Sequence, residues 1–157
     1  MYDISKPPVI DARTDWEAAL QLPGSSQMGY MKKIFEELPW QKMILNQNLI
    51  LNTNPENESY ILSSISTNKK VAIAYTPTGN PIKIDLSKID SKRINAYWFN
   101  PRSGKAKRIG NFETIKPQEF KPWSSGRGSD FLLILTAENY NIDYQELHDW
   151  NSEKAIK

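Results

Sequence analysis

The sequence predicts a mainly β fold, an antiparallel β-sandwich of about eight strands preceded by two or three short α-helices. Three features of the chain support this prediction. Apolar residues alternate with other residues along several short segments, as in a strand with one buried face. Clusters of Pro, Gly, Asn and Ser separate these segments at short intervals, which is typical of a sandwich. Before about residue 47, by contrast, apolar residues recur at helical spacing.

The N-terminal segment is expected to hold two helices and one further turn. Pro7-Pro8 makes the first residues irregular, because consecutive prolines are incompatible with a helix. Asp15 can cap a short first helix that ends at Pro23-Gly24. Ser25 or Ser26 can then cap a second helix that ends at Pro39, and the residues up to Leu45 can form one more turn.

The second helix carries an apolar stripe that is too large to be left in water. Its members recur at spacings of three or one, which places them on one helical face: Met28, Met31, Ile34, Phe35 and Leu38. Large exposed apolar patches usually mark an interface. The stripe is therefore expected to dock on the β domain or on a second copy of the chain.

The stretch from Val71 to Gly104 predicts three strands joined by two turns, a β-meander at the centre of the domain. Its strands cover residues 71–76, 82–87 and 94–99, and each alternates with a period of two. Pro77-Thr78-Gly79-Asn80 and residues 100–104 supply residues that favour turn dihedral angles.

The alternation in these strands also predicts the core. The larger side chains of the most apolar strands are expected to share one buried cluster between two sheets, namely Ile73, Trp98, Leu133 and Leu135. The same alternation turns Tyr97 and Phe99 to the opposite face. Two aromatic side chains on that face need a cover, either a ligand, the N-terminal helices or the C-terminal tail, and the helices are the favoured one.

The remaining strands are shorter or weaker. Residues 60–65 form a strand before the meander, and residues 106–109, 112–115 and 119–123 form strands after it, with a turn at Gly110-Asn111. Asp130 to Leu135 is the most apolar segment and is expected to be a central strand. The polar residues 137–157 are expected to be a tail that could hold a weak helix.

The overall composition limits the classes of function. The chain has 157 residues, 20 basic and 18 acidic, and this near balance gives no global field that favours nucleic acid. It has no cysteine, which excludes disulfides, thiolate chemistry and a cysteine zinc site. No apolar run approaches the ~20 residues of a membrane span. The N-terminus lacks the features of a signal peptide.

No catalytic, cofactor-binding or metal-binding residue is predicted. The single histidine, His148, lies in the polar tail without a nucleophile motif around it. Asp85 and Asp130 lie in or beside apolar strands, so they could form the carboxylate pair that a glycosidase needs. Bonding of turn amides or strand ends is the more common role of such residues. The chain alone is therefore expected to hydrolyse no glycoside or peptide.

Four side chains are candidates for a ligand or an interdomain contact: Tyr97, Phe99, Trp123 and Arg102. An exposed aromatic face suits the C–H face of a sugar ring. Arg102 begins a basic cluster beside aromatic residues, a combination that can also bind nucleic acid. A cluster of four cations on a balanced chain is more often a solvated hairpin, so no nucleic-acid partner is predicted.

Several motifs resemble a family of bacterial enzymes. Residues 22–31, LPGSSQMGYM, and Leu38-Pro39-Trp40 are similar to the end of the barrel in apiosidase-like glycoside hydrolases. Residues 74–79, 98–104 and 130–135 are similar to the β domain that follows that barrel. This β domain is catalogued as a "putative collagen-binding domain" of a collagenase. The motifs occur in order over roughly residues 11–136.

The resemblance implies a division into a helical segment at 1–46, a β-sandwich domain at 47–136 and the tail at 137–157. It implies a non-catalytic C-terminal domain that supports the catalytic barrel of a glycoside hydrolase and contacts polysaccharide. The alternative is an independent adhesion module that binds collagen or glycan. The family's catalytic carboxylates lie on barrel strands that this chain lacks, so none is carried over. The resemblance also implies an extracellular or periplasmic location.

Overall fold

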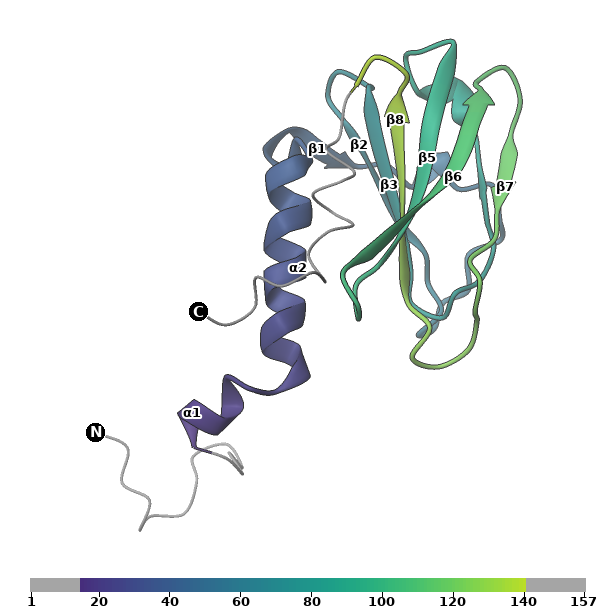
Figure 1. The fold of residues 1–157 in the computed structure, drawn as a ribbon. Coiled ribbons are helices and arrows are strands. Elements are labelled where there is room, and N and C mark those ends of the chain that lie inside the picture. The colour runs from purple at the N-terminus through teal and green to yellow at the C-terminus, as the bar shows by residue number, and fades with distance from the viewer. Residues whose placement is uncertain (1–14, 141–157) are drawn as a thin grey trace.

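The computed structural model describes residues 15–140, which form one six-stranded sheet, one two-stranded sheet and N-terminal helices (Figure 1). The mainly β class with preceding helices is confirmed. The expectations for residues 1–13, for His148 and for a helix in the tail lie outside the described residues. The helices are α1 (Trp16–Ala19) and α2 (Pro23–Glu37), with 3-10 helices at Trp40–Lys42, Gln47–Leu49 and Leu86–Lys88. The strands are β1 (Met43–Leu45), β2 (Leu62–Ser66), β3 (Val71–Thr76), β4 (Ile82–Ile84), β5 (Arg93–Asn100), β6 (Lys105–Glu113), β7 (Gln118–Phe120) and β8 (Phe131–Ala137).

The large sheet has the order β1-β2-β3-β8-β5-β6, and all its neighbouring strands are antiparallel. The apolar strand β8 is central, as predicted. The predicted meander is wrong, because β8 lies between β3 and β5, and β4 pairs with β7 in the second sheet. Ile82 and Ile84 of β4 are both fully buried, so the chain crosses to the other layer to complete the core.

The main core lies between the two sheets. Trp98, Leu133 and Leu135 belong to it, as predicted, but Ile73 does not. Ala72 and Ala74 are the β3 side chains in this core, and they pair with the two leucines of β8. The alternation of β3 was therefore predicted with the wrong face inward. The reason is that the opposite face is also apolar and covered, so the larger side chains of β3 are accommodated there.

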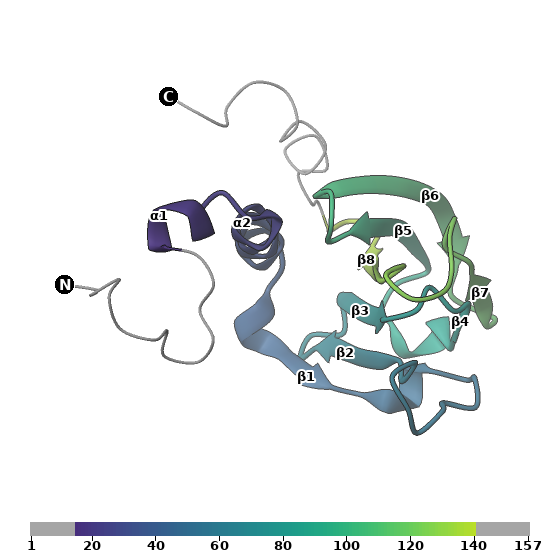
Figure 2. The same cartoon turned by 90° about the horizontal axis from the view of Figure 1, so that it is seen from below.

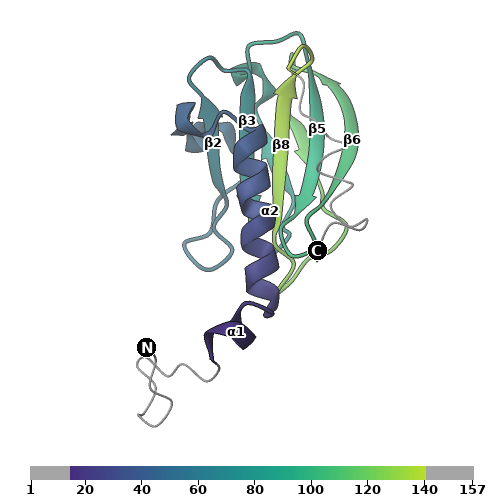
Figure 3. The same cartoon turned by 60° about the vertical axis from the view of Figure 1, so that its left-hand side comes forward.

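Helix α2 covers that opposite face of the large sheet (Figures 2 and 3). Ile34 and Leu38 of the helix form a second buried cluster with Val71, Phe99 and other sheet residues. Tyr97 also packs against this cluster. The prediction that the helices cover the outward aromatic side chains is confirmed, and two of the five stripe residues, Ile34 and Leu38, dock on the β domain. Part of the stripe, Met28, Met31 and Phe35, stays exposed.

The helix boundaries follow from local chemistry. Asp15 caps α1 as predicted, because its Oδ1 accepts a hydrogen bond of 2.7 Å from the backbone N–H of Ala18. Helix α2 begins at Pro23, earlier than predicted, and neither Ser25 nor Ser26 caps it. A proline is well suited to the first helical position, since its missing N–H would have no partner there.

Two further segments differ from the prediction. The turn expected at Gly110-Asn111 is absent, because β6 continues through it with a bulge opposite Ala96 and Tyr97. The helical turn expected up to Leu45 is replaced after Lys42 by β1. This strand begins before residue 47, and the division at residues 46 and 47 stays a prediction.

Gly104, in the turn after β5, permits a close approach of α2 to the sheet. It has a φ of +67°, and a Cβ at this position would lie 2.6 Å from the ring of Tyr30 on α2. We expect Gly104→Ala to lower the melting temperature, because a non-glycine residue in this conformation costs about 1–2 kcal/mol before the clash with the ring is counted. Gly29→Ala is the matched control in α2, where a Cβ meets no atom within 4 Å. It should raise the melting temperature. Two shifts of the same sign would contradict this account.

Candidate functional site

The candidate site lies at the end of the large sheet where β5 ends and β8 begins. Arg102, in the turn after β5, places its Nε 3.2 Å from Oδ1 of Asp130. Its guanidinium carbon lies 5.2 Å from the ring centroid of Phe131, the first residue of β8. Phe131 is fully buried, so it provides a fixed base for the exposed groups around it. We call these residues, together with Tyr75, Lys107 and Trp123, the Trp123 cluster.

Trp123 presents the largest aromatic surface of the cluster. Its side chain is 50% exposed, and its ring centroid lies 4.6 Å from that of Phe131 in an edge-to-face arrangement. Lys107 from β6 places its Nζ 5.9 Å from the centroid of the Trp123 ring. Cations at this distance are attracted to an indole face. The indole is thus held between a buried aromatic ring and a cation, and half of its surface is exposed.

Tyr75 and Asp130 supply polar groups beside this surface. The Tyr75 hydroxyl donates a hydrogen bond of 3.4 Å to Oδ2 of Asp130. Burial raises the pKa of Tyr75, the negative charge of Asp130 raises it further, and Arg102 lowers it in part. Tyr75 therefore stays a protonated donor near neutral pH. The arrangement offers an aromatic face, a donor and a carboxylate, which suits a hydroxylated ligand.

The turn after β3 supports the loop that follows Trp123. Gly79 has a φ of +65°, and a Cβ there would collide with the backbone carbonyl oxygens of Ser124 and Ser129. The backbone N–H of Gly126 donates a hydrogen bond of 2.8 Å to the carbonyl oxygen of Thr78. A glycine at position 79 thus permits two loops to touch, and it holds the backbone next to Trp123.

The structure brings together two of the four predicted contact residues. Trp123 and Arg102 both pack on Phe131, whereas Tyr97 and Phe99 lie on the face under α2. A role in ligand binding stays a prediction for all four. Sequence reasoning missed Phe131 as the link. The available signal was its position after Asp130 at the start of the most apolar segment.

The two carboxylates considered for catalysis have local partners. Oδ1 of Asp85 accepts hydrogen bonds from the backbone N–H and the hydroxyl of Ser87, at 3.2 and 2.6 Å, and so caps the 3-10 helix that follows. Asp130 pairs with Arg102 and Tyr75. Among residues 15–140, no group of three or more acidic or histidine side chains could hold a metal ion. No helix in this range is long and apolar enough to cross a membrane.

The solved structures that are similar to the chain include two glycoside hydrolases. One is described as "Glycoside hydrolase", with a TM-score of 0.80 and 26% identity over 89% of this chain and 31% of its own. The other is a glycoside hydrolase family 5 protein from Bacteroides vulgatus ATCC 8482, with a TM-score of 0.74 and 30% identity over 82% of this chain and 28% of its own. The chain therefore spans about a third of the length of these relatives.

The family comparison concerns the β portion of the chain. No curated protein matches the sequence. A family model described as "Putative collagen-binding domain of a collagenase" matches residues 44–136, which run from the second residue of β1 to the penultimate residue of β8. This match covers more than half of the chain, and the chain belongs to that family.

Proposed function

We propose that the chain is the non-catalytic C-terminal accessory domain of a bacterial glycoside hydrolase. One observation carries the proposal. The structural likeness covers 89% of this chain but only 31% of a glycoside hydrolase. This is more of the chain than the family model matches, so the likeness includes residues outside 44–136. Most of this chain thus resembles one part of a larger glycoside hydrolase.

The helices supply the expected contact with the catalytic barrel. Several large apolar side chains of this region stay exposed after α2 has docked on the sheet: Trp16, Leu20, Leu22, Met28, Met31, Phe35 and Trp40. Phe35 and Trp40 contact each other edge to face, with 5.9 Å between their centroids. An exposed apolar patch of this kind marks an interaction site. The part of the glycoside hydrolases that this chain does not span is the proposed occupant. An extracellular or periplasmic location of the parent protein is part of the same proposal, and it rests on the family resemblance.

The Trp123 cluster supplies the proposed contact with polysaccharide. The exposed half of the indole can stack on a sugar ring, while Asp130 and Arg102 can exchange hydrogen bonds with sugar hydroxyls. Accessory binding of this type needs no acid or base. It raises the local concentration of the polymer near the catalytic part of the enzyme, as a second linked site does.

We expect Trp123→Ala to abolish the retardation of the chain in gels that contain its polysaccharide, while the melting temperature changes little. The gels should contain neutral and acidic polysaccharides from plants and bacteria. Incubation of the chain with the same polysaccharides should release no reducing sugar. Trp16→Ala is the matched control, because Trp16 is also exposed but lies on α1. If the Trp123→Ala variant were retarded in the gel as strongly as the wild type, the Trp123 cluster would not be the polysaccharide-binding site. Sugar release that is lost in Asp85→Asn or Asp130→Asn would contradict the non-catalytic assignment.

The second candidate function is an independent adhesion module that binds collagen or glycan. The description of the family favours it. Co-sedimentation of the chain with fibrillar collagen separates the two candidates. Saturable binding to the fibrils, without any need for an enzyme partner, would favour the adhesion module over the accessory domain.

A further inference from the structure

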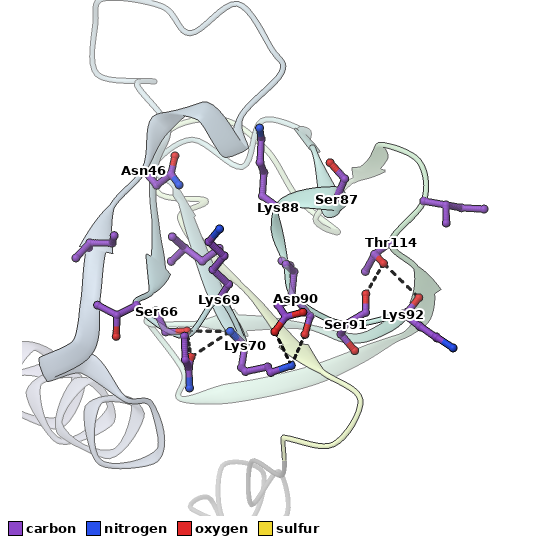
Figure 4. A pocket seen from close by; sticks show the side chains of 16 residues that line it. Asn46, Ser66, Lys69, Lys70, Ser87, Lys88, Asp90, Ser91, Lys92 and Thr114 are labelled. Atoms are coloured by element: carbon purple, nitrogen blue, oxygen red, sulfur yellow. Dashed lines mark hydrogen bonds and ion pairs between the residues drawn. The ribbon is translucent and has the colours of Figure 1, made fainter.

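A groove opens at the end of the large sheet opposite the Trp123 cluster, where β3 begins and β8 ends (Figure 4). It has a volume of about 1020 Å³. The turn between β2 and β3 forms one wall, and residues 87–92 form another. The edge strand β1 and the residues after β6 complete it. The residues that line the groove come from turns that are far apart in the sequence, so no single sequence motif predicts it.

Positive charge predominates in this groove. Four lysines and a single carboxylate line it, namely Lys69, Lys70, Lys88, Lys92 and Asp90, although the chain as a whole is nearly balanced. Lys70 already satisfies Asp90, because its Nζ lies 3.0 Å from Oδ2 and also donates to the Asp90 carbonyl oxygen. Lys88 makes only a loose pair, 3.9 Å from Asp85. Within the described part of the chain, no ion pair joins Lys69 or Lys92 to a carboxylate, so their charges can serve a ligand.

Lys69 has a backbone conformation that its residue type disfavours. With a φ of +55°, it is the only non-glycine residue among residues 15–140 that has a positive φ. Its N–H donates to the carbonyl oxygen of Ser66 at 2.7 Å, and its own carbonyl accepts from the N–H of Asp90 at 2.9 Å. Glycine or asparagine would adopt this conformation with less strain. Strain of this kind is concentrated at functional sites, which points to a use for the lysine side chain.

The lysine side chains come from different walls of the groove. Figure 4 shows Lys69 and Lys88 on two separate walls, Lys70 at the base against Asp90, and Lys92 pointing away from the other three. The walls are fixed by hydrogen bonds, since Thr114 donates to the carbonyl oxygens of Ser91 and Lys92. Because these walls are fixed, their backbone loses little conformational freedom when an anion binds.

We propose that this groove binds an acidic polysaccharide through its carboxylate groups. Lysines act as point charges for carboxylates, and the exposed Asn68, Thr67 and Ser87 can bond sugar hydroxyls. Ile44 and Ile115 give apolar rims for the C–H faces of the rings. Among residues 15–140, no aromatic side chain lines the groove, so this part of the chain supplies no stacking platform of the kind that binds single-stranded nucleic acid. The choice of a glycan as the polymer rests on the proposed function.

The test measures the affinity of the full chain for polygalacturonate by isothermal titration calorimetry. Lys69→Asn and Lys88→Gln should each weaken binding roughly twofold to fivefold, the range for exposed ion pairs. Each should also reduce the dependence on salt. Lys69→Asn should leave the melting temperature unchanged or higher, because asparagine tolerates the left-handed conformation. Lys121→Gln is the matched control, since Lys121 is exposed but outside the groove, and its binding should equal that of the wild type.

Three results would overturn the proposal. The first is an affinity for polygalacturonate that neither groove variant changes. The second is equal, lysine-dependent binding of polyglutamate, which would show a general anion site rather than a glycan site. The third is binding that is lost in Trp123→Ala but kept in the lysine variants. That third result would show that the groove is not the binding site, and it would leave the proposed accessory function intact.

Discussion

Replacement of Trp98 by alanine is expected to lower the free energy of unfolding by about 3–5 kcal/mol, the range for deleting a large buried aromatic side chain. Trp98 is 2% exposed and belongs to the main core. Its ring contacts Phe131 edge to face at 6.0 Å, so the cavity would lie beneath the Trp123 cluster as well. Equilibrium unfolding in urea, followed by far-UV circular dichroism, measures the change.

Trp98→Phe is the informative control for this variant. The indole Nε1 is buried, and no hydrogen-bond acceptor reaches it among the described residues. A phenyl ring keeps much of the packing and removes this unpaired donor, whose burial is itself costly. We expect Trp98→Phe to cost far less than Trp98→Ala. Equal losses of stability in the two variants would show that apolar packing is not what holds the indole in the core.

Replacement of Ile34 by glutamate should produce the second large loss, about 2–4 kcal/mol, because it places an unpaired charge between α2 and the sheet. Ile34 is 5% exposed and packs in the cluster with Leu38, Val71 and Phe99. The charge should release the helix, so the amide protons of α2 should exchange with solvent faster than those of the sheet.

Met28→Glu is the matched control on the same helix. Met28 is 60% exposed, so the same charge there meets water and should leave the melting temperature nearly unchanged. Light scattering at low and high protein concentration adds a second test of the exposed face. If Ile34→Glu and Met28→Glu were equally stable, α2 would not be docked on the β domain in solution.

The parts of the fold that depend on one strong local signal could be predicted from the sequence. The apolar run of β8 marked it as central, and Asp15 marked the start of α1. The face of β3 could not be predicted, because both faces of that strand are covered and both sets of side chains are apolar. The period of two divides the residues of a strand between two faces. It does not show which face packs against the main core.

Strand order and sites depend on contacts between distant parts of the chain. The short turns predicted a meander in which consecutive strands are neighbours. Instead β8 lies between β3 and β5, where its apolar side chains are buried on both faces of the sheet. Trp123 and Arg102 could be chosen by residue type, but their common support on Phe131 follows only from the fold. The lysine groove joins turns more than forty residues apart, from Lys69 to Thr114.

The most direct test of the accessory-domain account is the mass of the native protein that carries this chain. An antiserum raised against the chain should be used to probe the cytoplasmic, periplasmic and secreted fractions of the source cells. The account predicts a band of about three times the 18.1 kDa of this chain, since the chain spans 31% of a similar glycoside hydrolase. It also predicts that this band lies outside the cytoplasm. A single band at 18.1 kDa would contradict the account and favour an independent module.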